Sequence, residues 1–335
     1  MRLSPTSIAY RPTLDVLSTQ QAIKFIKDSF EDDLAKTLRL HRVSAPLFVT
    51  SKSGLNDGLN GVETPISFDI EDASEHVEIV HSLAKWKRMA LKQYEVSLGQ
   101  GIYTDMNAIR KDEKLDFIHS VYVDQWDWEI AIGKEQRTLA YLKQTVRKIY
   151  ACLRRIGKKV EKKYPFLHSC LPEKITFIST SKLEKEYPHL SRKEREDEIT
   201  RKYGAVFLYG IGCPLKDGMP HDGRAADYDD WKLNGDILVY YPLYDMALEL
   251  SSMGIRVDEI SLEKQLKAKG ETVKLSNPYC QDVINKRLPY SIGGGIGQSR
   301  LCFFFLQKAH IGEVQASIWD EKEVAALKKN HIDLL

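Results

Sequence analysis

The first regular pattern along the chain is an apolar stripe in which Ile23, Ile26, Phe30, Leu34 and Leu38 recur every three or four residues. This spacing places apolar side chains on one face of a helix. Because serine and threonine are good helix caps, the pair at positions 18 and 19 predicts where that helix begins.

Residues 43–50 follow with a strand-like pattern that contains Pro46. Proline lacks the amide hydrogen that a central strand donates, so we predict an edge or interface strand. The helix and strand of residues 19–50 could be an ordinary core helix with an edge strand, or could form a dimer interface.

Further along, residues 120–129 alternate in polarity, so that Gln125 and Asp127 share one face of a predicted strand. The remaining patterns predict helices at 135–163, 182–203 and 262–269, and strands at 205–212, 236–241 and 248–257. Because strands and helices do not alternate regularly, the order favours an α+β fold with a mainly antiparallel sheet. We expect residues 1–17 to be a loose N-terminal extension and residues 18–335 to form a single domain.

The composition excludes several classes of protein. Of the 335 residues, 43% are hydrophobic and 29% are charged, as in ordinary globular proteins. The net charge of +2 gives no general attraction for nucleic acid. The basic run 147–163 is interleaved with apolar residues, so it reads as the solvated face of a helix or as a local patch for a polyanion.

The cellular compartment is indicated by features that the sequence lacks. No N-terminal secretory signal is visible, and no apolar stretch reaches the roughly 18 residues of a membrane span. The five cysteines are odd in number and include no CxxC pair. We therefore expect a cytoplasmic protein in a reducing compartment, without a membrane segment.

The segment Gly293 to Arg300 reads GGGIGQSR and precedes an apolar run. Glycines allow a backbone to approach a ligand closely, and a helix that begins here would direct its amides at an anion. Arg300 could then contact a phosphate or stack on a base. The spacing matches neither a Rossmann nor a Walker motif, so a tight strand-to-helix turn remains the alternative.

Two shorter clusters are also candidates for ligand binding. Arg110 ends a predicted strand, with Glu113 three residues further on, which suits either a phosphate and an adenine amino group or a surface ion pair. Gln125 and Asp127 are polar on an inward strand face and therefore need partners. An amino acid with an ammonium group would satisfy them, as would an internal hydrogen-bond network.

Acidic residues form the last cluster, from Asp227 to Glu249. Hard oxygen ligands of this kind hold Mg²⁺, often together with substrate phosphates. The residues from 227 to 230 alone could be a solvated turn, whereas Glu249 lies within an apolar strand and is harder to explain in that way.

These clusters lie within longer runs that closely resemble the ammonia-dependent aspartate–ammonia ligases, which have a class II aminoacyl-tRNA-synthetase-like fold. The resemblance covers roughly residues 20–320. The runs that carry it are HSLAKWKR (81–88), HSVYVDQWDWE (119–129), GAVFL (204–208), DYDDW (227–231), LNGDIL (233–238), ELSSMGIRVD (249–258) and GGGIGQSR (293–300).

The resemblance implies a role for each part. The helix and strand of residues 19–50 correspond to motif 1 and a homodimer interface, and residues 18–335 to the catalytic domain. The implied nucleotide site is Arg110 on the α-phosphate, Glu113 at the adenine, and Gly295, Gly297 and Arg300. The implied magnesium ligands are Asp236 and Glu249, with Ser252 beside them. The implied aspartate pocket consists of Asp57, Ser82, Lys87, Gln125, Asp127, Asp229 and Arg256.

The implied reaction has two steps. The β-carboxylate of L-aspartate attacks the α-phosphate of ATP and releases pyrophosphate, while Arg110, Arg300 and Mg²⁺ stabilise the charge. Ammonia then attacks the β-aspartyl-adenylate, and AMP leaves with asparagine as the product. Asp57 is the first candidate to take the proton of the ammonium ion, and Asp229 is the second.

Two alternatives remain to be distinguished. An aspartyl- or asparaginyl-tRNA synthetase shares the adenylate chemistry but usually carries an anticodon-binding domain of about 100 residues, for which the chain has no room, so we expect no tRNA partner. A catalytically silent amino-acid sensor would be expected to lack Arg110, Glu249 or Arg300, and all three are present.

Overall fold

The computed structural model describes residues 4–59 and 63–335. Its α-helices are α1 (Val16–Leu38), α2 (Ala84–Gln93), α3 (Leu139–Lys163), α4 (Thr180–Glu186), α5 (Arg192–Tyr203), α6 (Glu259–Lys269), α7 (Pro278–Ile284), α8 (Gln298–Phe305) and α9 (Glu321–Lys329). Its strands are β1 (Leu40–Arg42), β2 (Phe48–Thr50), β3 (Ser67–Ile70), β4 (Glu75–Ile79), β5 (Gly101–Ile109), β6 (Tyr122–Ile132), β7 (Thr176–Ser179), β8 (Ala205–Tyr209), β9 (Asp229–Tyr241), β10 (Met246–Arg256) and β11 (Tyr290–Gly297).

Among the described residues, eight strands form one sheet in the order β1-β5-β6-β11-β10-β9-β8-β7. All the inner pairs are antiparallel, and only the outermost pairs, β1 with β5 and β7 with β8, are parallel. A small separate sheet has the order β2-β4-β3. The predicted α+β fold with a mainly antiparallel sheet is therefore confirmed.

The two faces of the large sheet differ sharply in polarity, as β6 illustrates. Trp126 and Trp128 are fully buried on one face, within the main hydrophobic core. The alternate residues Gln125, Asp127 and Glu129 lie on the opposite face because successive side chains of a strand point to opposite sides. The polar pattern of residues 120–129 thus predicted correctly which side chains share a face.

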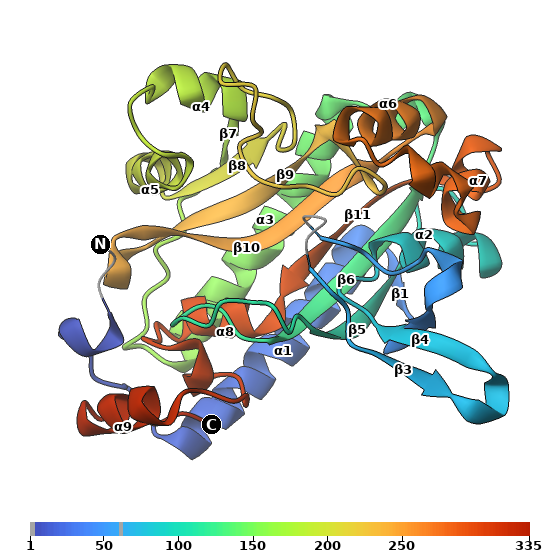
Figure 1. The fold of residues 1–335 in the computed structure, drawn as a ribbon. Helices are drawn as coiled ribbons and strands as arrows, with labels where there is room; N and C mark the ends of the chain where they lie inside the picture. Colours follow the sequence, from blue (N-terminus) through green and yellow to red (C-terminus); the bar gives the residue numbers. More distant parts are fainter. Residues whose placement is uncertain (1–3, 60–62) are drawn as a thin grey trace.

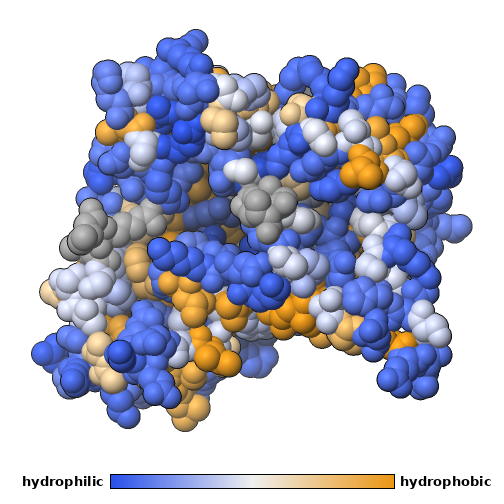
Figure 2. Space-filling model, viewed as in Figure 1, coloured by the Kyte–Doolittle hydropathy of each residue, from blue (hydrophilic) through white to orange (hydrophobic). Residues whose placement is uncertain are grey.

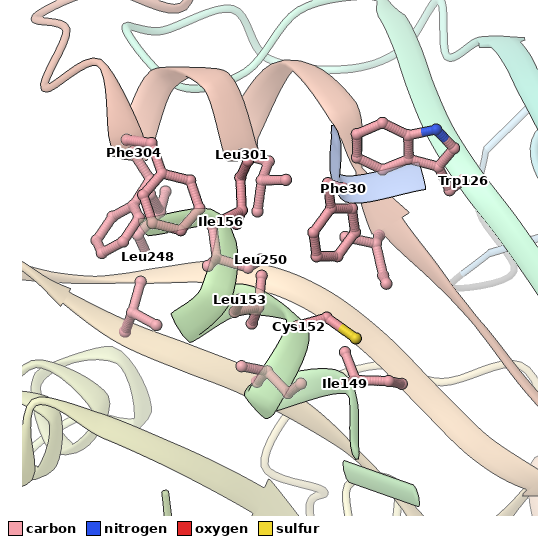
Figure 3. Close-up of a cluster of buried hydrophobic side chains, with 14 of the residues drawn as sticks. Phe30, Trp126, Ile149, Cys152, Leu153, Ile156, Leu248, Leu250, Leu301 and Phe304 are labelled. Carbon is pink, nitrogen blue, oxygen red and sulfur yellow. The ribbon is translucent and has the colours of Figure 1, made fainter. Parts of the chain in front are cut away.

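Helices α1, α3 and α8 cover the apolar face, and α1 and α3 pass behind the sheet in Figure 1. Phe30 of α1 packs against Trp126, with ring centroids 5.1 Å apart, and Figure 3 shows Leu301 and Phe304 of α8 near Ile156 of α3. Burying a large apolar side chain of this kind stabilises the fold by about 1.5–3 kcal/mol. This layer holds the sheet rigid behind the polar face.

Helices cover the polar face at its two ends (Figure 1). At one end, Leu183 of α4 and Ile199 of α5 pack on the β8 residues Val206 and Leu208. At the other end, α2 packs on β5 and β6 through a second core cluster that includes Leu91. The middle of the face, over β9, β10, β11 and β6, is left for the polar residues described below.

Two boundaries near the N-terminus differ from the predictions. Helix α1 begins at Val16, because Asp15 caps it by accepting a hydrogen bond from the Ser18 amide at 2.7 Å. The predicted strand 43–50 is shorter, and β2 starts only at Phe48. Pro46 lies outside both β1 and β2, which are edge strands of their sheets. Proline has no amide hydrogen to donate to a neighbouring strand, which explains why this residue belongs to neither strand.

The predicted helix 182–203 is in fact two helices, α4 and α5. Pro188 lies between them, and proline cannot donate the hydrogen bond that a continuing helix needs. The strand predicted at 236–241 is longer than expected, since β9 already begins at Asp229. This early start brings Asp229 into the sheet beside Arg256.

The N-terminal segment is packed rather than loose. Ile8 and Leu14 lie against the main core, and the Tyr10 hydroxyl donates a 2.8 Å hydrogen bond to Glu313 Oε2. Within the described residues, no helix combines the length and apolar character that crossing a membrane requires.

Candidate active site

The polar face of the sheet holds a cleft of about 290 Å³ and, next to it, a small pocket of about 80 Å³. Figure 2 shows that this face of the molecule is mostly hydrophilic and is hollowed near its centre. The cleft and the pocket are continuous, because they share the wall residues Leu59, Arg110, Gln125, Tyr228, Ser252 and Gly295. Every predicted site residue except Asp236 lines one or both of them.

Strand pairing explains how residues so far apart in sequence meet here. Ser252 of β10 pairs with Asp236 of β9 on one side and with Gly295 of β11 on the other. Gly295 in turn pairs with Asp127 of β6. These four residues form a row across the sheet, and the predicted metal and amino-acid residues are therefore neighbours in the ladder.

The glycine run is part of this sheet, not a turn. Gly293 and Gly295 lie in β11, and the chain passes from Gly297 directly into α8. A methyl group added at Gly293 would overlap the Glu129 carboxylate, and one added at Gly295 would overlap the Gln125 amide. The glycines therefore form a flat floor that lets polar side chains from β6 and β10 lie across β11.

Arg256 forms a buried ionic network on this floor. Its Nε and Nη2 donate to the two oxygens of Glu129 at 2.9 and 2.7 Å, and its Nη1 donates to Asp229 Oδ1 at 2.5 Å. Burial acts to lower the pKa of Arg256, but the two carboxylates outweigh burial and raise it well above its ordinary value. Burial also raises the pKa of Asp229, although Arg256 opposes this shift.

Helix α2 contributes two further buried cations. Lys87 is 1% exposed, pairs with Asp127 and donates a 3.1 Å hydrogen bond to the Gly294 carbonyl. Burial lowers the pKa of Lys87, despite the opposing effect of Asp127. Lys85 pairs with Asp227 at 2.9 Å and so ties the loop before β9 to this helix. Two residues apart, the lysines point to nearly opposite sides of α2, and both are buried because this part of the helix is enclosed on all sides.

Asp57 supplies a carboxylate from the opposite wall of the small pocket. It is 2% exposed and accepts hydrogen bonds from the Ser82 hydroxyl at 2.5 Å and the Leu59 amide at 2.6 Å. Both donors are neutral, so within residues 4–59 and 63–335 no hydrogen-bonded cation balances the negative charge of Asp57. The loop that carries Asp57 is described up to residue 59, and residues 60–62 lie outside the described part of the chain.

Arg110 lies where the cleft and the pocket meet, and it lines both. Its Nη2 donates to the His81 carbonyl at 3.3 Å, and its buried Nε has no hydrogen-bond partner among the described residues. No ion pair of Arg110 occurs in residues 4–59 and 63–335, so the surface ion pair considered as an alternative is wrong. Glu113 follows across a turn closed by its amide, which donates to the Arg110 carbonyl at 3.0 Å.

Arg300 lines the far side of the cleft, in the first turn of α8. Its Nη1 lies 3.3 Å from the Glu249 carbonyl and 3.9 Å from the Glu249 carboxylate. The expectation that the amides at this helix start point at a ligand is wrong for Ser299. That amide donates at 3.0 Å to the side chain of Asp124 instead.

The predicted magnesium residues are neighbours but are not equally accessible. Glu249 and Ser252 line the cleft, whereas Asp236 is buried beneath it and pairs with Arg224. Burial raises the pKa of Asp236 to about 7; Arg224 opposes this shift and the nearby Glu249 adds to it. One oxygen of Asp236 is buried without a hydrogen-bond partner in the described residues.

Glu129, Tyr228 and Arg224 are among the site residues that were not predicted from the sequence. Glu129 continues the alternation of Gln125 and Asp127 along β6, so the same pattern contained the signal for it. Tyr228 lines both cavities and Arg224 lines the cleft, but both lie in an irregular loop before β9 that has no periodicity. Their position in the site is visible only in the three-dimensional structure.

The fold of the described chain is shared with class II aminoacyl-tRNA synthetases. It is similar to the asparaginyl-tRNA synthetase of Pyrococcus horikoshii, solved in complex with asparaginyl-adenylate, with a TM-score of 0.65 at 15% identity, covering 90% of this chain and 70% of the synthetase. The Entamoeba histolytica enzyme, also solved with asparaginyl-adenylate, gives a TM-score of 0.63 at 15% identity, covering 89% of this chain and 66% of that protein. The chain thus spans about two thirds of the length of these synthetases, and the likeness establishes the fold.

Sequence comparison defines the family within this class. The profile of the aspartate–ammonia ligase family matches residues 17–331. The chain is 58% identical to the aspartate–ammonia ligase of Clostridium perfringens strain SM101 over 327 residues, which is 97% of each protein. It is also 58% identical to that of Fusobacterium nucleatum over 328 residues, covering 98% of this chain and 100% of the relative. The chain belongs to the aspartate–ammonia ligase family, as the resemblance indicated.

Proposed function

We propose that this protein converts L-aspartate to L-asparagine with ammonia and ATP, through a β-aspartyl-adenylate, and releases AMP and pyrophosphate. The observation that carries the proposal is the position of Arg110 between a cleft large enough for a nucleotide and a small pocket rich in charged groups. A reaction that joins a nucleotide to an amino acid needs a cation at this junction, where the two substrates meet.

In the first step, the pocket binds aspartate, and its β-carboxylate meets the α-phosphate of ATP beside Arg110. Lys87 and Arg256 are the cations that hold the carboxylates of the substrate, and Asp127, Gln125 and the Ser82 hydroxyl receive its polar groups. Arg110 and Arg300 face the phosphates from the two sides of the cleft and stabilise the charge that develops as pyrophosphate leaves. Glu113 and the floor at Gly295 and Gly297 complete the nucleotide site.

In the second step, ammonia attacks the adenylate and AMP departs. Ammonia is mostly protonated near neutral pH, so a carboxylate that holds ammonium and accepts its proton is required. Asp57 suits this role better than Asp229, because Asp229 is bound to Arg256, whereas the donors that Asp57 has among the described residues are neutral. The structure therefore supports the ranking of these two residues made from the sequence.

We also propose that Mg²⁺ binds Glu249 and Asp236, with the Ser252 hydroxyl beside them. The residues fit, because Asp236 has a buried unpartnered oxygen and its protonation is favoured by the nearby Glu249, a repulsion that a divalent cation would relieve. The described residues hold no group of three or more His, Cys, Asp or Glu side chains suited to a metal. Two carboxylates are enough when substrate phosphates complete the coordination. When bound, the ion neutralises phosphate charge.

Glu249→Gln tests this site, because glutamine removes the negative charge while preserving the shape. We expect the Mg²⁺ concentration for half-maximal activity to rise about tenfold, since one charge-assisted ligand is lost. Steady-state rates measured over a magnesium titration give this value. Glu263→Gln on the exposed side of α6 is the matched control and should leave the titration unchanged. An unaltered magnesium requirement in Glu249→Gln would remove this residue from the proposed site.

We further propose that residues 18–335 act as one catalytic domain and that the protein works in the cytoplasm. Two copies of the chain associate through the helix and strand of residues 19–50. Leu17, just before that region, and Leu47 and Phe48, near its end, are exposed large apolar residues, which supports an interface there. All five cysteines are free, as suits a reducing compartment. A sedimentation mass equal to one chain would refute the dimer.

The tRNA synthetase alternative is not favoured. Identity to the ligases is 58%, whereas identity to the synthetases of the same fold is 15%. Arg110 and Arg300 both line the cleft, so the structure also offers no reason to prefer a silent sensor.

An end-point assay tests the proposed function directly. The purified protein is incubated with aspartate, ATP, magnesium and ammonium, and asparagine, AMP and ADP are quantified. We expect asparagine and AMP in equal amounts. ADP in place of AMP would rule out the adenylate route, and aminoacyl-tRNA formed when tRNA is added would revive the synthetase alternative.

A further inference from the structure

Asp124 of β6 is a buried carboxylate with no role assigned above. It is 7% exposed and lies at the end of the cleft, one residue before Gln125. Its oxygens accept from the Ser299 amide at 3.0 Å, the Ser299 hydroxyl at 2.8 Å, Lys27 Nζ at 3.1 Å and Gln315 Nε2 at 3.4 Å. One carboxylate thus joins α1, β6, the start of α8 and a C-terminal segment.

The contacts with Ser299 matter because α8 has no cap of its own. The residue that precedes the helix is Gly297, which has no side chain to accept from the first-turn amides. Uncapped amides at a helix start destabilise the first turn, and a carboxylate there also interacts favourably with the helix dipole. Asp124 supplies this cap from a neighbouring strand.

Arg300 follows Ser299 directly in the same turn, so the position of its backbone depends on how that turn is held. In the described part of the chain its guanidinium is only weakly held, through contacts of 3.3 and 3.9 Å with Glu249. We propose that Asp124 is a positioning residue that fixes the first turn of α8 and thereby aims Arg300 into the nucleotide cleft. This inference rests on the proposed function, in which Arg300 contacts the phosphates.

A double-mutant cycle between Asp124 and Arg300 tests the inference. Asp124→Asn keeps the shape of the side chain but loses the charge that strengthens the cap. We expect KM for ATP to rise about tenfold, because a charge-assisted hydrogen bond is weakened, while KM for aspartate stays within about twofold. In the Arg300→Ala background, the same substitution should change KM for ATP by less than about twofold, since the residue through which it acts is gone.

Asp105→Asn is the matched control. Asp105 accepts a 3.0 Å hydrogen bond from the side chain of Gln298, at the same end of α8, but binds no backbone amide of the helix. It should therefore leave KM for ATP nearly unchanged. If Asp124→Asn does not fold, Ser299→Ala removes the 2.8 Å contact with Asp124, together with a 3.1 Å hydrogen bond from Gln315, and should raise KM for ATP about threefold.

The outcomes separate this inference from the proposed function. An equal effect of Asp124→Asn with and without Arg300 would overturn the inference, because Asp124 would then act on the nucleotide directly or through general packing. An unchanged KM for ATP in both folded variants, Asp124→Asn and Ser299→Ala, would also overturn it. Failure of the unsubstituted protein to form AMP would instead refute the proposed function itself.

Discussion

Arg256→Met is expected to lower the free energy of unfolding by about 3–5 kcal/mol and to abolish asparagine formation. Methionine has a similar length but no charge, so Glu129 and Asp229 would face each other across the site without a cation. The network is fully buried, and water cannot replace the lost hydrogen bonds. Removing one charged partner from such a network therefore lowers the stability of the fold far more than replacing all of its charged residues together.

Urea denaturation monitored by tryptophan fluorescence measures the stability, and the end-point assay measures activity. Arg287→Met is the control, because its ion pair with Asp282 is about half exposed and should be worth less than about 1 kcal/mol. Combining Arg256→Met with Glu129→Gln should recover part of the lost stability but none of the activity. A single Arg256→Met variant as stable as the unsubstituted protein would show that the network is not the structural centre of the pocket.

The sequence predicted the elements whose pattern is dictated by burial. The stripe from Ile23 to Leu38 faces the core in α1, and the alternation along β6 separates the two faces of the sheet, because both patterns follow directly from helix and strand geometry. Boundaries were less predictable where a single capping residue decides them. Asp15, and not Ser18, starts α1, since its side chain reaches the free amide.

Whether a site residue could be predicted depended on whether its surroundings come from the same strand or from distant parts of the sequence. Residues on regular strands, such as Gln125, Asp127 and Glu249, could be recognised as polar positions in apolar surroundings. The function of the glycines could not, because the side chains lying over Gly293 come from β6 and β10, far away in sequence. Asp124 was overlooked for the same reason, as the helix that it caps begins at residue 298.

Arg110→Ala is expected to reduce kcat/KM for AMP formation on the order of 10³-fold, with little change in stability. Its guanidinium lines both cavities but, among the residues that the structure describes, makes only one weak hydrogen bond, to the His81 carbonyl. A buried donor left without a protein partner contributes little to folding, yet it is ready to bind an anion without first breaking an ion pair. This separates Arg110 from Arg256, three of whose five N–H donors are already engaged by carboxylates.

Steady-state kinetics in ATP and in aspartate, together with urea denaturation, distinguish these two classes of arginine. Arg110→Lys should recover only part of the rate, because an ammonium group cannot reproduce the planar fork of a guanidinium. Lys111→Ala is the matched control, since the adjacent side chain is exposed and lines neither cavity. If Arg110→Ala formed AMP at the normal rate, no cation would be needed at the junction of the two cavities, and the adenylate mechanism would lose the observation on which it rests.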